Sequence, residues 1–311
     1  MGANAIDLTT VAAVNSILEQ AANTDATEIQ REITAYSQNI LTRTGRGFLS
    51  GVRAYSERYN GNGSNDLPVR NYPVLAVTSL SVNGIAIPAS PDYIQSGYVI
   101  DTEGSIANIA IIGGQGGGAY AAGDDRWGVR PGGWGSYGNA PPLGQATFRF
   151  VQGVQNVAIA YLAGYTINVP SEAQTVPATP GPYTKQVTNA ATFYADQGVT
   201  LADGTPLTAV ASAPGPMQYV APTFGSVPRG TYTFNAAQEG AVVNISYSYG
   251  APPFDLQEAC GRLVAQMYRK RQWIGQDSQV QPGVGTTAYS KLEVEVGTAA
   301  VIERYKMRFM P

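Results

Sequence analysis

The residue types that could carry out catalysis are few in this sequence. Its 311 residues include no histidine, which excludes Ser-His-Asp and Cys-His catalysis, histidine metal sites and histidine pH switches. The single cysteine, Cys260, excludes an intrachain disulfide and a cysteine metal cluster. With only four lysines, carboxylates, tyrosines and serines are the main remaining candidates for acids, bases and nucleophiles.

Three local patterns could still indicate chemistry, and each has a simpler interpretation. The pair Asp124–Asp125 could bind a cation, but two solvated acids in a loop are the favoured interpretation. The glycines at 113–118 suggest a phosphate cradle, yet no Lys-Ser/Thr pair and no amphipathic helix follow them. Cys260 lies on an apolar helical stripe, which favours a buried structural thiol over a nucleophile. The sequence therefore predicts that the protein is not an enzyme and that it has no catalytic residue, no metal site and no cofactor.

Two groups of residues could instead contact a partner. The basic cluster at the end of a predicted helix could bind DNA or an acidic surface, or could simply place cations at a helix C-terminus, where the helix dipole favours them. Aromatic residues in a glycine-rich stretch could anchor a partner, or could fold back onto the chain's own sheet. The candidate residues are Arg269, Lys270, Arg271, Trp127, Trp134 and Tyr137.

The overall composition narrows the classes of protein further. The formal net charge is −3, and only 13% of residues are charged while 44% are hydrophobic, so the chain as a whole is not a basic nucleic-acid binder. No run approaches the roughly 18 apolar residues that a membrane span needs. The first residues lack the basic and apolar regions of a secretory signal. We expect a soluble protein made in a cytoplasm.

Apolar residues at helical spacing occur near both ends of the chain. After Asp7, a predicted N-cap, they indicate a first short helix, and a longer helix is predicted over 25–44, where Gly45 ends it. A third helix is predicted to open at Asp255 and run to about 274, and a short one follows Gly297. The pairs Asp25/Glu28 and Asp255/Glu258 have the spacing of capping boxes. We expect the helices at 25–44 and 255–274 to pack together.

The middle of the chain alternates apolar and polar residues with a period of two, which predicts strands. Asn83–Gly84 predicts a hairpin turn. The stretch 113–142 contains eleven glycines in thirty residues, which predicts a long loop that either stays mobile or is ordered by a partner. Further strands are predicted between 186 and 248.

The sequence also contains two segments that resemble each other. Residues 156–164 and 242–250 both show a strand ending in a Tyr-containing segment and glycine, followed by proline, an acidic residue and alanine. The simpler interpretation is that about 80 residues are inserted between a strand and the helix it would otherwise enter. Chance similarity between two strands is the alternative.

These elements predict an α+β fold: a discontinuous helical bundle from the two chain ends, with β-rich domains inserted between them. The predicted domains are a helical core of 1–70 with 251–311, a β domain of 71–170 that contains the glycine-rich loop 113–142, and an inserted β domain of 171–250.

The last residues, 289–311, are predicted to form an arm that binds a neighbouring subunit or another protein. Charged and apolar residues alternate over 291–296, as in a strand with one buried face. The alternative is that this strand joins the chain's own sheet and the final helix packs on its own bundle. The residues that would contact the partner are Leu292, Val294, Val296, Tyr305 and Phe309.

The order of several motifs resembles the head–tail connector, or adaptor, proteins of tailed bacteriophages. The motifs include Thr44-Gly45-Arg46-Gly47-Phe48, the Ser79–Gly84 hairpin, Tyr98-Val99-Ile100-Asp101, Arg271–Gly275 and Ile302–Lys306. The resemblance covers roughly 1–110, 145–170 and 251–311. The glycine-rich loop and residues 171–250 depart from the compact family pattern.

The resemblance implies a structural virion protein that forms a ring, typically twelvefold, beneath the portal protein. Its partners would be the portal, tail or tail-adaptor proteins and further copies of itself. Double-stranded DNA would pass through the ring without specific binding, consistent with a chain poor in lysine. Its fifteen arginines suit interface pairing. The alternative from another class is a β-rich binding module, such as a capsid decoration or host-glycan-binding virion protein.

Overall fold

The computed structural model describes residues 4–21, 25–91, 97–101, 108–112, 150–178, 181, 183–271, 278–281, 285–288 and 296–306. Within them the chain forms two compact units. One comprises the described residues of 4–52 and 165–306, and the other comprises the described residues of 53–164. This division is coarser than the three domains predicted from the sequence.

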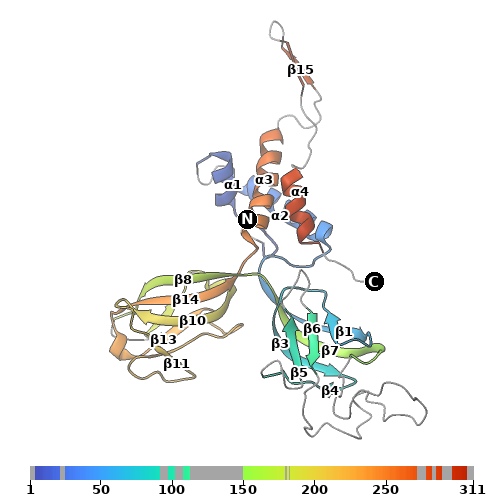
Figure 1. The fold of residues 1–311 in the computed structure, drawn as a ribbon. Helices are drawn as coiled ribbons and strands as arrows, with labels where there is room; N and C mark the ends of the chain where they lie inside the picture. Colours follow the sequence, from blue (N-terminus) through green and yellow to red (C-terminus); the bar gives the residue numbers. More distant parts are fainter. Residues whose placement is uncertain are drawn as a thin grey trace, which may run out of the picture. The chain divides into compact units, whose positions relative to one another are not determined.

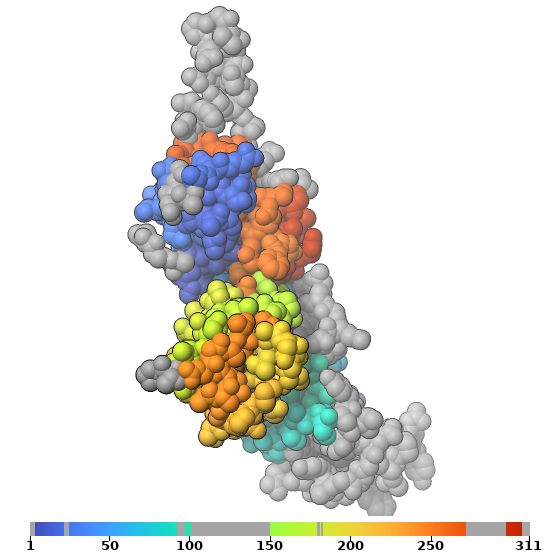
Figure 2. All heavy atoms as spheres, turned by 90° about the vertical axis from the view of Figure 1, so that its left-hand side faces the viewer, coloured from blue at the N-terminus to red at the C-terminus, as the bar shows by residue number. Residues whose placement is uncertain are grey.

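Four helices in the first unit share one hydrophobic core. Figure 1 shows them together, and Figure 2 shows the blue surface of the N-terminal helices against the orange and red surface of the C-terminal ones. Ile29 and Ile33 of one end meet Leu256 and Val264 of the other, all of them buried. The helices are α1 (Val11–Leu18), α2 (Ala26–Thr44), α3 (Phe254–Lys270) and α4 (Val296–Arg304).

The two long helices pack together as expected, whereas the predicted capping boxes at their starts do not form. Gly45 ends α2 with a φ of 71°, a left-handed conformation that glycine adopts without strain. Thr10, not Asp7, caps α1. The Asp7 carboxylate instead accepts hydrogen bonds from Gln30 and Thr34 of α2. Asp25 is the N-cap residue of α2 as predicted, but its carboxylate accepts from Tyr268 and Arg271 and closes no capping box. Asp255 lies inside α3, after the N-cap Pro253, and its carboxylate accepts from Tyr305.

Two β modules follow one another along the chain. The first spans residues 52–164 and the second spans 166–250. The strands of the first are β1 (Val52–Gly61), β2 (Asp66–Pro68), β3 (Val74–Val82), β4 (Ile85–Ala86), β5 (Gly97–Asp101), β6 (Asn108–Ile112) and β7 (Gly153–Gly164). Those of the second are β8 (Thr166–Thr175), β9 (Thr184–Gln186), β10 (Phe193–Leu201), β11 (Thr208–Val210), β12 (Gln218–Val220), β13 (Thr231–Phe234) and β14 (Val242–Gly250).

The second β module repeats the strand order of the first. In the first, the sheets run β1-β7-β3-β4 and β2-β6-β5; in the second, they run β8-β14-β10 and β9-β13-β12-β11. The last strand of each module therefore lies between its first and third strands. Each module encloses its own hydrophobic core. A further hairpin, β15 (Ser278–Gln281) with β16 (Gly285–Ala288), follows α3.

The register of the central strands is also repeated. Ile159 on β7 pairs with Leu80, and Ile245 on β14 pairs with Val199 at the corresponding position. Both third strands carry two irregularities at the same two steps: Val74/Ala76 and Val77/Ser79 in β3, and Phe193/Ala195 and Asp196/Gly198 in β10. Bulges are specific local features of a fold, so two in matching positions argue against chance similarity. The two similar segments, 156–164 and 242–250, are thus the central strands of two copies of one module.

The predicted fold class is wrong. The described regular structure is mainly β, with sixteen strands in five sheets and four α-helices. The helices share a compact unit with the second β module instead of forming a separate bundle that carries β domains. Residues 52–68, assigned from sequence to the helical core, contain β1 and β2. The helical stripes were easy to recognise, but short strands of β-branched and aromatic residues account for more of the chain.

Candidate functional site

The outward face of α3 is a candidate interface, because two pockets lie along this helix. Its apolar stripe, with Leu256, Cys260 and Val264 all buried, packs against α1 and α2. The opposite side therefore points outward, because residues three or four apart share a helix face. Exposed side chains on that side are Phe254, Glu258, Arg262 and Arg269.

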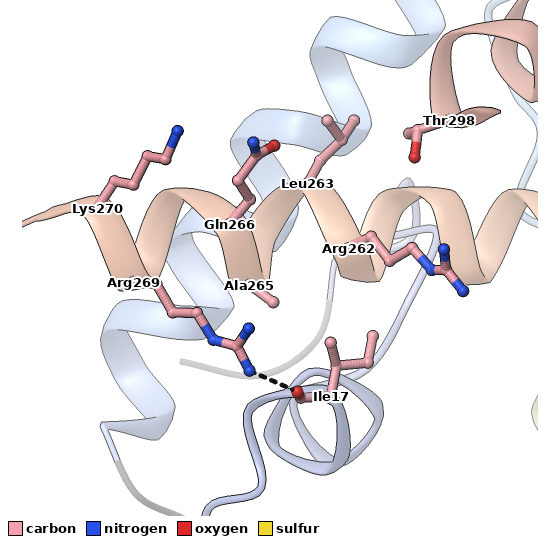
Figure 3. A pocket seen from close by; sticks show the side chains of 8 residues that line it. All are labelled: Ile17, Arg262, Leu263, Ala265, Gln266, Arg269, Lys270 and Thr298. Carbon is pink, nitrogen blue, oxygen red and sulfur yellow. Dashed lines mark hydrogen bonds between the residues drawn. The ribbon is translucent and has the colours of Figure 1, made fainter. Parts of the chain in front are cut away.

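A basic pocket of about 450 Å³ lies along the second half of α3. Figure 3 shows Arg262, Arg269 and Lys270 extending from α3, with Ile17 of α1 nearby. The Arg269 Nη2 donates to the backbone oxygen of Ile17 at 3.0 Å, which fixes the arginine beside the end of α1. Apolar side chains of Ile17, Leu263 and Ala265 contribute to the lining. Such a pocket suits a ligand with carboxylates and an apolar group.

An acidic pocket of about 420 Å³ lies along the first half of α3. It is lined by Asp255 and Glu258 together with Phe254, and it also reaches Ile17. Glu258 accepts a hydrogen bond from Arg262 Nε at 2.9 Å, one helical turn away. Both side chains of this pair are 53% exposed, so it contributes little stability. The two pockets therefore place opposite charges at the two ends of one helix.

The third cation of the predicted basic cluster, Arg271, has a structural role. Its Nη1 donates to Glu28 at 3.2 Å and its Nη2 to Asp25 at 3.1 Å. Its guanidinium lies 3.7 Å from the centre of the Tyr268 ring. The Tyr268 hydroxyl also donates to Asp25. Hydrogen bonds from Tyr268 and then Arg271 lower the pKa of Asp25, so this group ties the end of α3 to the start of α2.

Tyr305, predicted to anchor a partner-binding arm, packs into its own chain. Its hydroxyl donates to Asp255 at 2.6 Å, and its ring meets Tyr165 edge-on at 5.6 Å. Burial and then Asp255 raise its pKa. Ile302 on α4 is 2% exposed. Residues 296–306 therefore belong to the helical core, as the helical half of the alternative predicts, and residues 291–295, which it places in the chain's own sheet, lie outside the described residues.

The remaining predicted contact residues divide into two groups. Val296 is expected in a strand but is the first residue of α4. The others, Trp127, Trp134, Tyr137, Leu292, Val294 and Phe309, lie outside the described residues.

No catalytic arrangement emerges among the residues that the structure describes. Cys260 is buried, and its burial raises the thiol pKa to about 11, so it is a poor nucleophile. Its sulfur lies 3.7 Å from Ser37 Oγ. Within the described ranges, no three Asp, Glu or Cys side chains gather as a metal site would require. None of the helices described is both long and apolar enough to cross a membrane.

Sequence reasoning missed the acidic half of this site. The sequence patterns indicate helix caps at Asp255 and Glu258 and an i,i+4 pair of Glu258 with Arg262, which the structure contains, but they do not single out Phe254. The signal that could have found them is the spacing of Phe254, Glu258, Arg262 and Arg269, which places them on one helix face opposite the apolar stripe. Comparison with known proteins finds no family model that matches this sequence and no significant match among curated proteins.

Proposed function

We propose that this chain is a structural virion protein, a head–tail connector that forms a ring beneath the portal of a tailed bacteriophage. The observation that carries the proposal is the order of its elements. α1 and α2, with the Gly45 stop, precede a β module with the Asn83–Gly84 hairpin; α3, ending in arginines, and α4 then follow. This order agrees with the motifs on which the resemblance to adaptor proteins rests.

The surface chemistry of the helical cluster supports a role in protein contacts. Its two pockets carry charged rims and partly apolar walls, as interface pockets do. The chain is poor in lysine and carries a net charge of −3. A ring with few cations to hold phosphates would let DNA slide through its channel.

Binding to the portal protein of the same phage tests the proposal. The purified chain is mixed with preformed portal rings, and the complex is isolated by size exclusion and imaged by electron cryomicroscopy. The expected result is a closed ring of twelve copies attached to one end of the portal. A chain that leaves portal rings bare but binds a panel of host glycans would contradict the connector role and favour the binding-module alternative.

A matched control identifies the surface used. Arg262→Glu alters the outward face of α3, whereas Arg31→Glu alters an arginine on α2 whose side chain is 69% exposed. If the helical cluster contacts the portal or a neighbouring subunit through α3, ring assembly falls for the first variant and is unchanged for the second. Equal assembly by both variants would place the contact elsewhere without removing the connector role.

A further inference from the structure

The outward face of α3 has a charge polarity along its length. Asp255 and Glu258 lie in its first half, Arg262 lies at its middle, and Arg269 lies in its last turn. A helix rises about 1.5 Å per residue, so the two charged ends are separated by roughly 15 to 20 Å. Such a face repels a parallel copy of itself and attracts an antiparallel one.

The two pockets on this face carry opposite charges. The basic pocket measures about 450 Å³ and the acidic pocket about 420 Å³. Ile17 of α1 lines both, so the two pockets adjoin each other along α3. A partner with the opposite order of charges would therefore meet both pockets in one contact.

Phe254 provides the apolar part of the same face. Its side chain is 69% exposed, at the acidic end of α3. An aromatic side chain gains most when it is buried in a pocket, and phenylalanine also contacts cations through its ring face. The basic pocket offers apolar walls, Ile17 and Leu263, beside Arg269. The chain thus carries both an exposed aromatic group and a pocket whose chemistry suits it.

We infer that two copies of this chain pair through the outward faces of α3, antiparallel and about a two-fold axis. The acidic end of each copy, with Phe254, then meets the basic pocket of the other. The contact is isologous, with the same surface used by both copies. Each charge–charge contact occurs twice.

The carboxylates remain able to make these contacts. Asp255 accepts from Tyr305, and Arg304 lies 3.7 Å away; Glu258 accepts from Arg262. An ionised carboxylate can accept about four hydrogen bonds, so each retains capacity for a cation of the second copy. Arg269 is exposed although it donates to Ile17.

An isologous contact closes at two subunits and does not extend into a ring. The inferred dimer is therefore a form of the free protein and does not depend on the proposed connector ring. If the dimer and the connector ring both exist, the dimer separates when the ring assembles. Self-association without portal tests the dimer, and portal binding tests the connector role.

Sedimentation velocity across a wide concentration range measures the pairing. The expected result for the unaltered chain is a reversible monomer–dimer equilibrium whose dissociation constant rises with salt, because opposite charges are screened. Phe254→Ala is expected to weaken the dimer about tenfold or more, as loss of a buried aromatic anchor does. A chain that stays monomeric at every concentration would overturn the inference.

A charge exchange between two variants provides the sharper test. Glu258→Lys alone places Lys opposite Arg269 in both contacts, and Arg269→Glu alone places Glu opposite Glu258. Each variant is expected to be monomeric. An equimolar mixture has opposite charges at both contacts of the mixed dimer, so association should return.

Three controls make the result decisive. Arg31→Glu changes a charge on α2 and should leave the dimer unchanged. Circular dichroism and thermal unfolding establish that each variant is folded. Arg269→Gln, which removes the charge without reversing it, should weaken the dimer less than Arg269→Glu. Failure of the mixture to associate, with both variants folded, would overturn the antiparallel arrangement.

Discussion

Tyr161 and Tyr247 occupy the same position in two successive β modules and make the same hydrogen bond. Each hydroxyl donates to a glutamate at 2.6 Å: Tyr161 to Glu57, and Tyr247 to Glu172. Each glutamate lies on the first strand of its module, beside the central strand that carries the tyrosine. An asparagine also reaches each tyrosine oxygen, Asn71 in the first module and Asn189 in the second.

Both modules contain this tyrosine–glutamate hydrogen bond, and in both the tyrosine is buried and needs a partner for its hydroxyl. Tyr161 is 1% exposed and Tyr247 is 0% exposed, and a buried hydroxyl without a partner costs free energy. Burial is the first cause that raises the pKa of both phenols, and the hydrogen-bonded glutamate adds to it. Both tyrosines therefore stay neutral donors at physiological pH.

The equivalence predicts matched effects of Tyr161→Phe and Tyr247→Phe. Each removes a hydrogen bond to a carboxylate, so each should lower the free energy of unfolding by about 1.5 to 3 kcal/mol. Urea unfolding of the whole chain, followed module by module with hydrogen exchange, measures the loss. Tyr249→Phe is the control, because the described residues offer its hydroxyl no hydrogen-bond partner. A large loss at one site and none at the other would contradict structural equivalence.

Acid should weaken the second module through Glu172. Burial alone would raise the pKa of Glu172, but hydrogen bonds from Tyr247, Gln174 and Thr188 outweigh it and hold the pKa below the ordinary value of 4.5. A lowered folded pKa means that the stabilisation is present above that ordinary value and is lost as the pH falls through the folded pKa. Glu172→Gln should therefore lower the urea midpoint at pH 7, and the difference should shrink at pH 3. An equal difference between the two urea midpoints at pH 7 and at pH 3 would show that the Glu172 carboxylate does not contribute in this way.

The second module should be removable as a unit. Deleting residues 166–251 joins Tyr165 to Pro252, which keeps the contact between Tyr165 and Tyr305. Because Gly164 ends β7 as Gly250 ends β14, the shortened chain should enter α3 after an equivalent strand. Cooperative thermal unfolding with the helical signal retained is the expected result.

A partial deletion provides the matched control for that experiment. Removing residues 166–201 eliminates β8 to β10 but leaves β14 without its two neighbours. This variant should aggregate or unfold without cooperativity. Equal behaviour of the two deletions would show that residues 166–250 are not an independent module.

Cys260 should be unreactive in the folded protein. Burial raises its pKa to about 11, so almost no thiolate forms at pH 8. Titration with a chromogenic disulfide at pH 8 should show no modification of the native chain and one thiol per chain in urea. Rapid modification of the native protein would mean that the helical core opens readily.

The sequence by itself determined the local elements whose signals are short-range. Gly45 predicted the end of α2, Asn83–Gly84 predicted the hairpin, and the apolar stripes predicted α2, α3 and their contact. Each depends on backbone preference or on residues within a few positions of one another. Phe254 and its acidic neighbours could have been recognised in the same way, from their spacing.

Only the tertiary structure decided where the polar side chains find their partners. Asp7 binds α2, Asp25 binds the end of α3 and Asp255 binds Tyr305, although each has the local sequence of a helix cap. A carboxylate takes whichever donors the fold brings closest, and those donors lie far away in the chain. Pairing between distant strands likewise decided that 156–164 and 242–250 are the centres of two equivalent modules, since register depends on partners that periodicity alone does not identify.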